Sequence, residues 1–301
     1  MSHRRAVALM VLCTLLWSIA GVVTRHLDAA RSFEVTFWRS AFNAAALLAA
    51  LLVIRGGALW RDIRRGGAAL WFSALCWAVM YTNFMLALTL TAVATVLVTM
   101  AISPLVTALF SRTFLHHRLP ARTWAAIGLA GAGIAWMFGR QALAVQGAGG
   151  PSMAGVFVAL GVPLAAGANW TLLQHMHERH IADPAVEEPQ MLPAVLLGAA
   201  MSAAVTLPLA LPFSATPHDV GLLALLGVVQ LAIPCLIVVR LTRVLPAPEV
   251  SLLGLLEVIF GVLLVWAGAG EVPSHDALLG GALVLAALVG NESWALRERL
   301  G

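Results

Sequence analysis

Two charged side chains stand deep inside long apolar stretches of the sequence. Glu257 lies about ten residues into the stretch Pro248–Gly268, and Arg39 lies within Phe33–Ile54. In a helix that crosses a bilayer, such a charge costs about 3 kcal/mol and must be neutralised, paired or exposed to water. Glu257 could therefore carry a proton or hold a substrate ammonium group, or it could be a hydrogen-bonded acid that ties helices together.

Arg39 is open to two interpretations. It shares a helical face with Asn43, one turn away, and lies roughly 9 Å from the outer end of its stretch. The side chain could snorkel outward as a structural anchor, or it could bind a substrate carboxylate. By residue type, Arg39 and His175 are the candidate partners of Glu257.

Hydroxyl side chains recur every four residues in the next candidate region. They are Thr91, Thr95, Thr99, Ser103, Thr107 and Ser111. Pro104 beside the middle of this stripe removes one backbone hydrogen bond. The hydroxyls could bond back to carbonyls and allow close packing. Alternatively, Thr99 and Ser103 face a wet cavity in which Pro104 exposes a carbonyl.

Several aromatic side chains lie too far inside apolar stretches to be interfacial anchors. Trp17, Trp77, Tyr81 and Trp170 are of this kind, and Asn169 precedes Trp170. Packing explains such residues, as does a binding cavity with aromatic walls and a few amides and hydroxyls. A cavity of that composition suits a small amphiphilic organic molecule.

The composition indicates an integral membrane protein, so these residues lie in helices surrounded by lipid. Of 301 residues, 61% are hydrophobic and 11% are charged, whereas a soluble domain has about 25% charged residues. All 18 basic residues are arginines, and the net charge is +4. In a membrane protein this excess indicates basic loops retained in the cytoplasm rather than a nucleic-acid partner.

No cofactor or metal is expected. His175, His177, Glu178 and His180 miss the spacing of a zinc-binding helix and lie at a helix end. Gly128, Gly131 and Gly133 follow no strand, so a dinucleotide site is not expected. Together with Gly280-Gly281 they predict close helix packing, within this chain or in a homodimer.

The hydropathy pattern predicts an all-α membrane protein with ten spans, each near the roughly 20 residues that cross a bilayer. The spans are Ala6–Arg25, Phe33–Ile54, Ala68–Leu88, Ala92–Phe110, Thr123–Gly139, Ser152–His175, Met191–Leu211, Val220–Val239, Pro248–Gly268 and His275–Ala295. With both termini in the cytoplasm, 14 arginines lie inside and 3 outside, and Arg39 lies within a span. This bias supports the orientation.

The two halves repeat one plan at an offset of about 153 residues. Pro104 corresponds to Glu257, Pro120 to Pro273 and Gly128 to Gly281. Residues 1–140 and 152–301 are thus predicted to be two five-helix repeats, joined by an outer loop over 141–151. Because each half has an odd number of spans, the halves are inverted, and a binding site is expected between them at the midplane.

Certain local motifs resemble those of the drug/metabolite transporter superfamily in its EamA-type branch. They are Trp38-Arg39, Ala94, Pro104, Leu256-Glu257-Val258, Phe260, Gly270-Glu271-x-Pro273 and Gly280-Gly281. The resemblance covers essentially the whole chain and is strongest to the YddG-type exporters of aromatic and other neutral amino acids.

The resemblance implies two inverted five-helix halves around a cavity lined by spans one, three, four, six, eight and nine. The second span, with Arg39, would then lie outside the lining. One departure stands out: the family usually has an acid after the fourth span, where this chain has His116-His117-Arg118. If that acid has a function in the family, only Glu271, in the second half of this chain, can carry it here.

We therefore expect an inner-membrane exporter of small metabolites, most of all neutral or aromatic amino acids, that works by alternating access. Trp17, Tyr81, Asn169 and Trp170 would hold the side chain, Thr99 and Ser103 would contact polar groups, and Glu257 would bind ammonium or a proton. The alternatives are export of drug cations or other metabolites, an intramembrane enzyme, and a structural or sensory partner. The enzyme is disfavoured because the spans offer one deep acid and no deep histidine pair.

Overall fold

The computed structural model describes residues 1–30, 32–91, 93–144, 153–183, 190–269 and 275–300, and these residues form helices without any strand. Eight helical segments are long and apolar enough to cross a membrane, judged by length and composition. They are His3–Thr24, Phe33–Arg55, Gly67–Ala87, Val96–Phe114, Ala154–Ala182, Leu192–Ala210, Pro217–Leu241 and Ala247–Gly268. The predicted fifth and tenth spans are also helices, α7 (Ala121–Ala144) and α14 (His275–Leu300), but these two are not among the eight that are long and apolar enough.

The helices of the first half are α1 (His3–Thr24), α2 (Ser32–Arg55), α4 (Gly67–Leu90), α5 (Val93–Met100), α6 (Ser103–Phe114) and α7. Those of the second half are α8 (Met153–Ala182), α9 (Leu192–Ala210), α10 (Pro217–Leu225), η2 (Leu226–Ala232), α11 (Ile233–Leu241), α12 (Ala247–Gly254), α13 (Leu256–Ala269) and α14. A short helix that the sequence did not predict, α3 (Ala58–Arg65), follows α2. It is amphipathic, with Leu59 buried and Trp60 exposed, as expected of a helix lying along a membrane surface.

Three of the expected spans are not continuous α-helices. The fourth is divided into α5 and α6, and the ninth into α12 and α13. At these divisions Ile102 N–H donates to Thr99 O at 3.2 Å, and Leu255 N–H donates to Leu252 O at 3.1 Å. Both bonds reach back three residues instead of four, so each break is one tight turn, and the two turns are 153 residues apart. The third interrupted span contains the π-helix η2.

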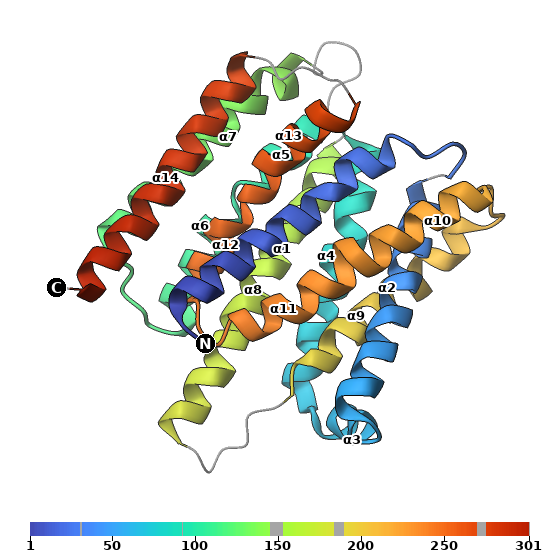
Figure 1. The fold of residues 1–301 in the computed structure, drawn as a ribbon, viewed down its shortest axis with the longest axis horizontal. Coiled ribbons are helices and arrows are strands. Elements are labelled where there is room, and N and C mark those ends of the chain that lie inside the picture. The colour runs from blue at the N-terminus through green and yellow to red at the C-terminus, as the bar shows by residue number, and fades with distance from the viewer. Residues whose placement is uncertain (31, 92, 145–152, 184–189, 270–274, 301) are drawn as a thin grey trace.

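The helices of one half pack mainly against those of the other (Figure 1). α1 packs on α13 and on η2 and α11, while α8 packs on α5, α6 and α4. α2 lies against α9, and α7 runs beside α14 at the left of Figure 1. Most of these contacts recur when the chain is shifted by 153 residues. This shift places α1 on α8, α6 on α13 and α4 on α11, so the packing of α1 on α13 and α11 corresponds to the packing of α8 on α6 and α4.

Close approach of α7 and α14 depends on two glycines. A Cβ placed on Gly133 would lie 2.7 Å from Gly280 O, and one on Gly280 would lie 2.9 Å from Met137 N. Real Cβ atoms essentially never come that close to backbone. The glycine packing expected from the sequence therefore occurs within one chain at Gly133 and Gly280, whereas a Cβ on Gly128 or Gly131 would meet nothing within 4 Å.

Buried acids fix the loops at the end of the protein opposite the N-terminus of α1. Asp219 accepts backbone hydrogen bonds from Asp28, Ala29 and Ala30 at 2.7–3.1 Å and closes a capping box with Thr216. Glu34 likewise accepts from the backbone of Ser214 and Ala215. These carboxylates are satisfied by the loops they hold, so they are structural.

Candidate functional site

The strongest concentration of buried polar groups lies where α1, α2, α4, α11 and α13 meet. Arg39 Nη2 on α2 donates to Tyr81 O on α4 at 3.2 Å, and the Tyr81 hydroxyl donates to Cys235 Sγ on α11 at 3.2 Å. Arg39 is 2% exposed, Tyr81 4% and Cys235 1%. Trp17 on α1 lies against the same sulfur. We call Trp17, Arg39, Tyr81, Cys235 and Glu257 the central cluster.

Glu257 on α13 completes the central cluster as its acid. The residue is half-buried, and its carboxylate makes no hydrogen bond to any described residue. Arg39 is the opposite charge that acts on it, yet no ion-pair contact joins the two side chains. The cluster thus holds a guanidinium group and a carboxyl group apart within the membrane-spanning part of the protein.

Two amides extend the central cluster along α2 and η2. Asn43 lies beside the Tyr81 hydroxyl, is fully buried, and makes no well-formed hydrogen bond with the described residues. Gln230 Nε2 on η2 donates to Trp17 O at 3.2 Å, while its Oε1 has no partner among those residues. Most buried polar groups in proteins have hydrogen-bond partners, so the unpartnered amide atoms of Asn43 and Gln230 call for an explanation.

The π-helix η2 brings the eighth span close to Arg39 and Asn43. A Cβ on Gly227 would lie 2.8 Å from both Arg39 O and Asn43 N, and 2.6 Å from Phe42 Cβ. Wide π-helical turns are rare and often occur at functional sites. Here the wide turn lies where η2 packs closely against the α2 backbone at Arg39 and Asn43.

Replacing Gly227 by alanine is expected to destabilise the protein by about 1–3 kcal/mol, because the new methyl group must displace backbone atoms of α2. The control is Gly221→Ala in α10, where a Cβ would meet nothing within 4 Å; this change should leave stability equal or slightly higher. Thermal unfolding in detergent, followed with a thiol-reactive dye that reports the three buried cysteines, compares the two. Equal melting temperatures would contradict the close η2–α2 contact.

The central cluster includes some of the residues expected from the sequence. Trp17, Tyr81 and Glu257 belong to it, and Tyr81 continues into an aromatic chain: it stacks on Trp77 with ring centroids 5.6 Å apart, and Trp77 meets Trp170 edge-on at 5.4 Å. These rings connect the cluster to α8.

Two other expected binding residues, and one more residue of the hydroxyl stripe, form hydrogen bonds within the protein itself. Asn169 Oδ1 accepts from the Ser73 hydroxyl at 2.6 Å, which ties α8 to α4. The Ser103 hydroxyl bonds Ser251 of α12 at 3.0 Å, and the Thr107 hydroxyl donates to Ser103 O at 2.8 Å. For Ser103 and Thr107 these bonds fit the packing interpretation of the hydroxyl stripe. Thr99 is buried on α5, just before the break.

The outward snorkelling considered for Arg39 is wrong, because its side chain is buried and bonded to Tyr81 O. Arg39 is the charge neighbour of Glu257, whereas no hydrogen bond or ion pair joins His175, half-buried on α8, to that acid. Glu271 lies outside the described residues. Sequence reasoning missed Cys235 and Gln230, which stand in an apolar stretch without any pattern to mark them.

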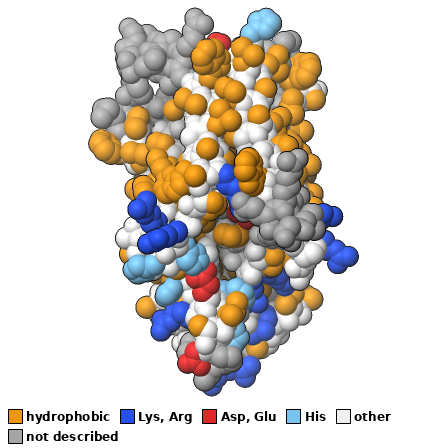
Figure 2. All heavy atoms as spheres, turned by 90° about the vertical axis from the view of Figure 1, so that its left-hand side faces the viewer, with side chains coloured by type: hydrophobic (Ala, Val, Ile, Leu, Met, Phe, Trp, Pro, Cys, Tyr) orange, Lys and Arg blue, Asp and Glu red, His pale blue; other side chains and the backbone are white. Residues whose placement is uncertain are grey.

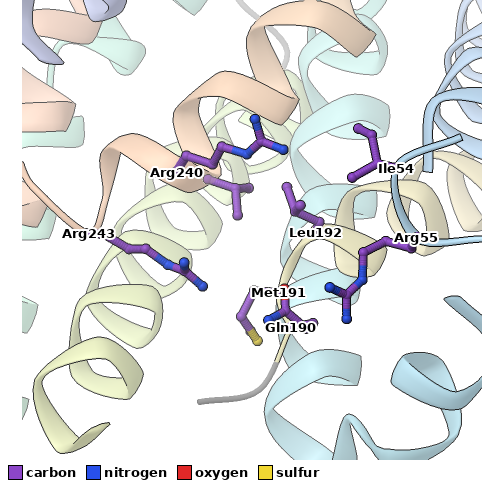
Figure 3. Close-up of a pocket in the computed structure, with 8 residues that line it drawn as sticks. Ile54, Arg55, Gln190, Met191, Leu192, Arg240 and Arg243 are labelled. Atoms are coloured by element: carbon purple, nitrogen blue, oxygen red, sulfur yellow. The ribbon is translucent and has the colours of Figure 1, made fainter. Parts of the chain in front are cut away.

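Two surface pockets lie at the arginine-rich end. One, of about 200 Å³, is bordered by Arg55, Arg240 and Arg243 around the start of α9 (Figure 3). The other is lined by Arg112, His116, His117, Arg118, Leu119 and Trp124. Figure 2 shows basic and histidine side chains in the lower half of one face and mostly hydrophobic ones above. Arg55 is paired with Asp62 at 2.7 Å, so part of this charge is neutralised locally.

Comparison with known proteins finds a family model that matches part of the first half and a solved structure that has a similar fold over nearly the whole chain. Residues 4–139 match the model of the EamA-like transporter family. A solved structure described only as "Crystal structure of protein" is similar over 98% of this chain and 99% of that chain, with a TM-score of 0.75. At 18% identity, this second likeness concerns the fold alone. No curated protein matches this sequence.

Proposed function

We propose that the protein is a transporter of small molecules and that the whole chain, not only residues 4–139, is of the EamA-like type. The family match and the apolar helices support a multi-pass membrane carrier. The observation that carries the proposal is the central cluster, which gathers a cation, an acid and aromatic rings from five membrane helices. Such a set at the depth of the spans is typical of a solute-binding site.

The proposed architecture is ten spans in two inverted repeats, 1–140 and 152–301, around this cluster. Support comes from the two tight turns at Ile102 and Leu255, and from the packing contacts that recur between the halves. Broken helices at corresponding positions of two repeats are typical of transporters, whose substrate sites lie at the repeat interface. Rocking of the halves about the cluster would give alternating access.

The proposed location is a bacterial inner membrane with both chain ends in the cytoplasm. In Figure 1 the first residues of α1 and the end of α14 lie at the lower-left ends of their helices. Arginines crowd the lower half of the face in Figure 2. Retention of basic residues in the cytoplasm accounts for this distribution.

The proposed substrates are neutral and aromatic amino acids, moved outward. Tyr81, Trp77 and Trp17 would pack against the substrate side chain, and Glu257 would take its ammonium group. A second candidate class is lipophilic drug cations, because the Glu257 carboxylate lacks a hydrogen-bonding partner in the described part of the chain.

Transport by the purified protein in liposomes tests the proposal. We expect saturable uptake of labelled tryptophan above empty liposomes, and competition by leucine and phenylalanine. The same assay with an imposed pH gradient shows whether protons drive it. Flux of the drug cation without flux of any amino acid would replace the first substrate class by the second, and no flux of either would refute the transporter.

A further inference from the structure

The α2 helix presents two buried hydrogen-bond donors without a well-formed bond to the described residues, and the second of them lies beside the Tyr81 hydroxyl. Arg39 Nε and Asn43 Nδ2 lie one turn apart, in residues 2% and 0% exposed, and neither atom has a hydrogen-bond partner among the described residues. A second guanidinium nitrogen, Nη2, is already held by Tyr81 O at 3.2 Å. This bond fixes the guanidinium group and leaves the Nε–H for another acceptor.

The acceptors of the same region are separated from these donors. Glu257 accepts no hydrogen bond, and Gln230 Oε1 has no partner in the described part of the chain. If Arg39 and Glu257 served only to neutralise each other, a direct contact with two parallel hydrogen bonds would be the favourable arrangement in a medium of low dielectric constant. The structure instead leaves opposite charges without a contact.

A guanidinium held by a hydrogen bond, a carboxyl group without a partner among the described residues, and nearby aromatic rings together complement a zwitterion. The α-carboxylate of an amino acid needs charged and amide donors, its ammonium group needs a carboxylate, and its side chain needs an apolar or aromatic surface. The donors for the carboxylate are on Arg39 and Asn43. The carboxylate for the ammonium group is that of Glu257. The aromatic surface is formed by Tyr81 and Trp17. A lipophilic amine would leave the donors on α2 unsatisfied, so they favour the amino acid.

We infer that Arg39, assisted by Asn43, binds the α-carboxylate of a zwitterionic amino acid whose ammonium group is held by Glu257. This inference rests on the proposed transport function and names the group that selects its substrate. It gives a binding role to the second span, where the family resemblance placed none.

The test compares substrates that differ in one charged group. Competition against labelled tryptophan in liposomes uses tryptophan and tryptophanamide, which keeps the ring and the ammonium group and lacks the carboxylate. The wild-type protein should prefer tryptophan by about tenfold or more, the effect of one charge-assisted contact. Arg39→Gln should remove this preference by weakening tryptophan alone, and Arg39→Lys should retain part of it. Arg240→Gln, at the exposed end of α11, is the control and should keep the full preference.

The wild-type comparison involves no substitution, so it can overturn the inference even where Arg39→Gln does not fold. Asn43→Leu, with its folding checked by thermal unfolding, should lower the preference in the same direction. Equal competition by tryptophan and tryptophanamide in the wild type would overturn the inference and leave the transport function standing. A folded Arg39→Gln protein with its preference intact would do the same. Absence of tryptophan transport in the wild type would instead refute the proposed amino-acid function.

Discussion

Substitution of Glu257 by glutamine is expected to raise the KM for tryptophan about 10- to 100-fold while the protein still folds. The neutral amide keeps the size of the side chain but loses the charge-assisted contact with the substrate ammonium, which is worth about 1.5–3 kcal/mol. Glu257 makes no hydrogen bond to the described residues, so folding should depend little on its charge. Initial rates of tryptophan uptake into liposomes, over a range of concentrations, measure the effect.

The matched control is Glu249→Gln, the same change eight residues earlier. Glu249 opens α12 and pairs with His3 at 2.5 Å at the end where α1 begins, away from the central cluster. We expect a normal KM for this variant. Two further outcomes are informative: an unchanged KM in Glu257→Gln would refute ammonium binding, and unchanged flux that no longer responds to a pH gradient would assign Glu257 to proton coupling.

The second large effect concerns stability rather than transport. Gly280→Leu is expected to lower the melting temperature by roughly 5–10 °C, because the side chain must push α14 away from the backbone of α7 at Gly133 and Met137. Overpacking against backbone costs about 3 kcal/mol, and the backbone has few ways to relax. Thermal unfolding with the thiol-reactive dye provides the measurement.

Gly290→Leu in the same helix is the control for this change. A Cβ at Gly290 meets nothing within 4 Å, and the position is exposed, so leucine there should be tolerated. If both variants melted together, the α7–α14 contact would not have the close geometry described here. A selective loss in Gly280→Leu would support packing of these helices within one chain.

Much of the helical arrangement could be predicted because a bilayer imposes simple length and polarity rules. Long apolar stretches such as Pro248–Gly268 can be recognised from composition. Eight of the ten expected spans are helices long and apolar enough to cross a membrane. Glu257 and Tyr81 could be singled out because a charge, or a lone tyrosine, is conspicuous in such a stretch. Interruptions were harder to predict: Pro104 marks the first, while nothing at Leu255 marks the second except its position 153 residues later.

Residues whose role depends on a neighbour from a distant helix could not be assigned in the same way. Ser103 and Asn169 looked like ligands, yet their hydroxyl and amide oxygen are taken by Ser251 and Ser73. Arg39 could have been an interfacial anchor or a ligand of a substrate carboxylate, and the structure shows that it turns inward to Tyr81 O. Helical periodicity gives the face on which a side chain lies, but not which helix covers that face.

The lipid environment, the helices and the few polar residues inside them follow from composition and hydropathy, because the cost of placing charge and unpaired backbone in lipid leaves few alternatives. Which of those residues meet follows only from how the helices pack. Arg39, Tyr81, Cys235 and Glu257 come from four segments scattered over more than 200 positions, and side-chain packing between the halves brings them together. Such long-range contacts follow from the complementary shapes of helix surfaces, which no local pattern in the chain records.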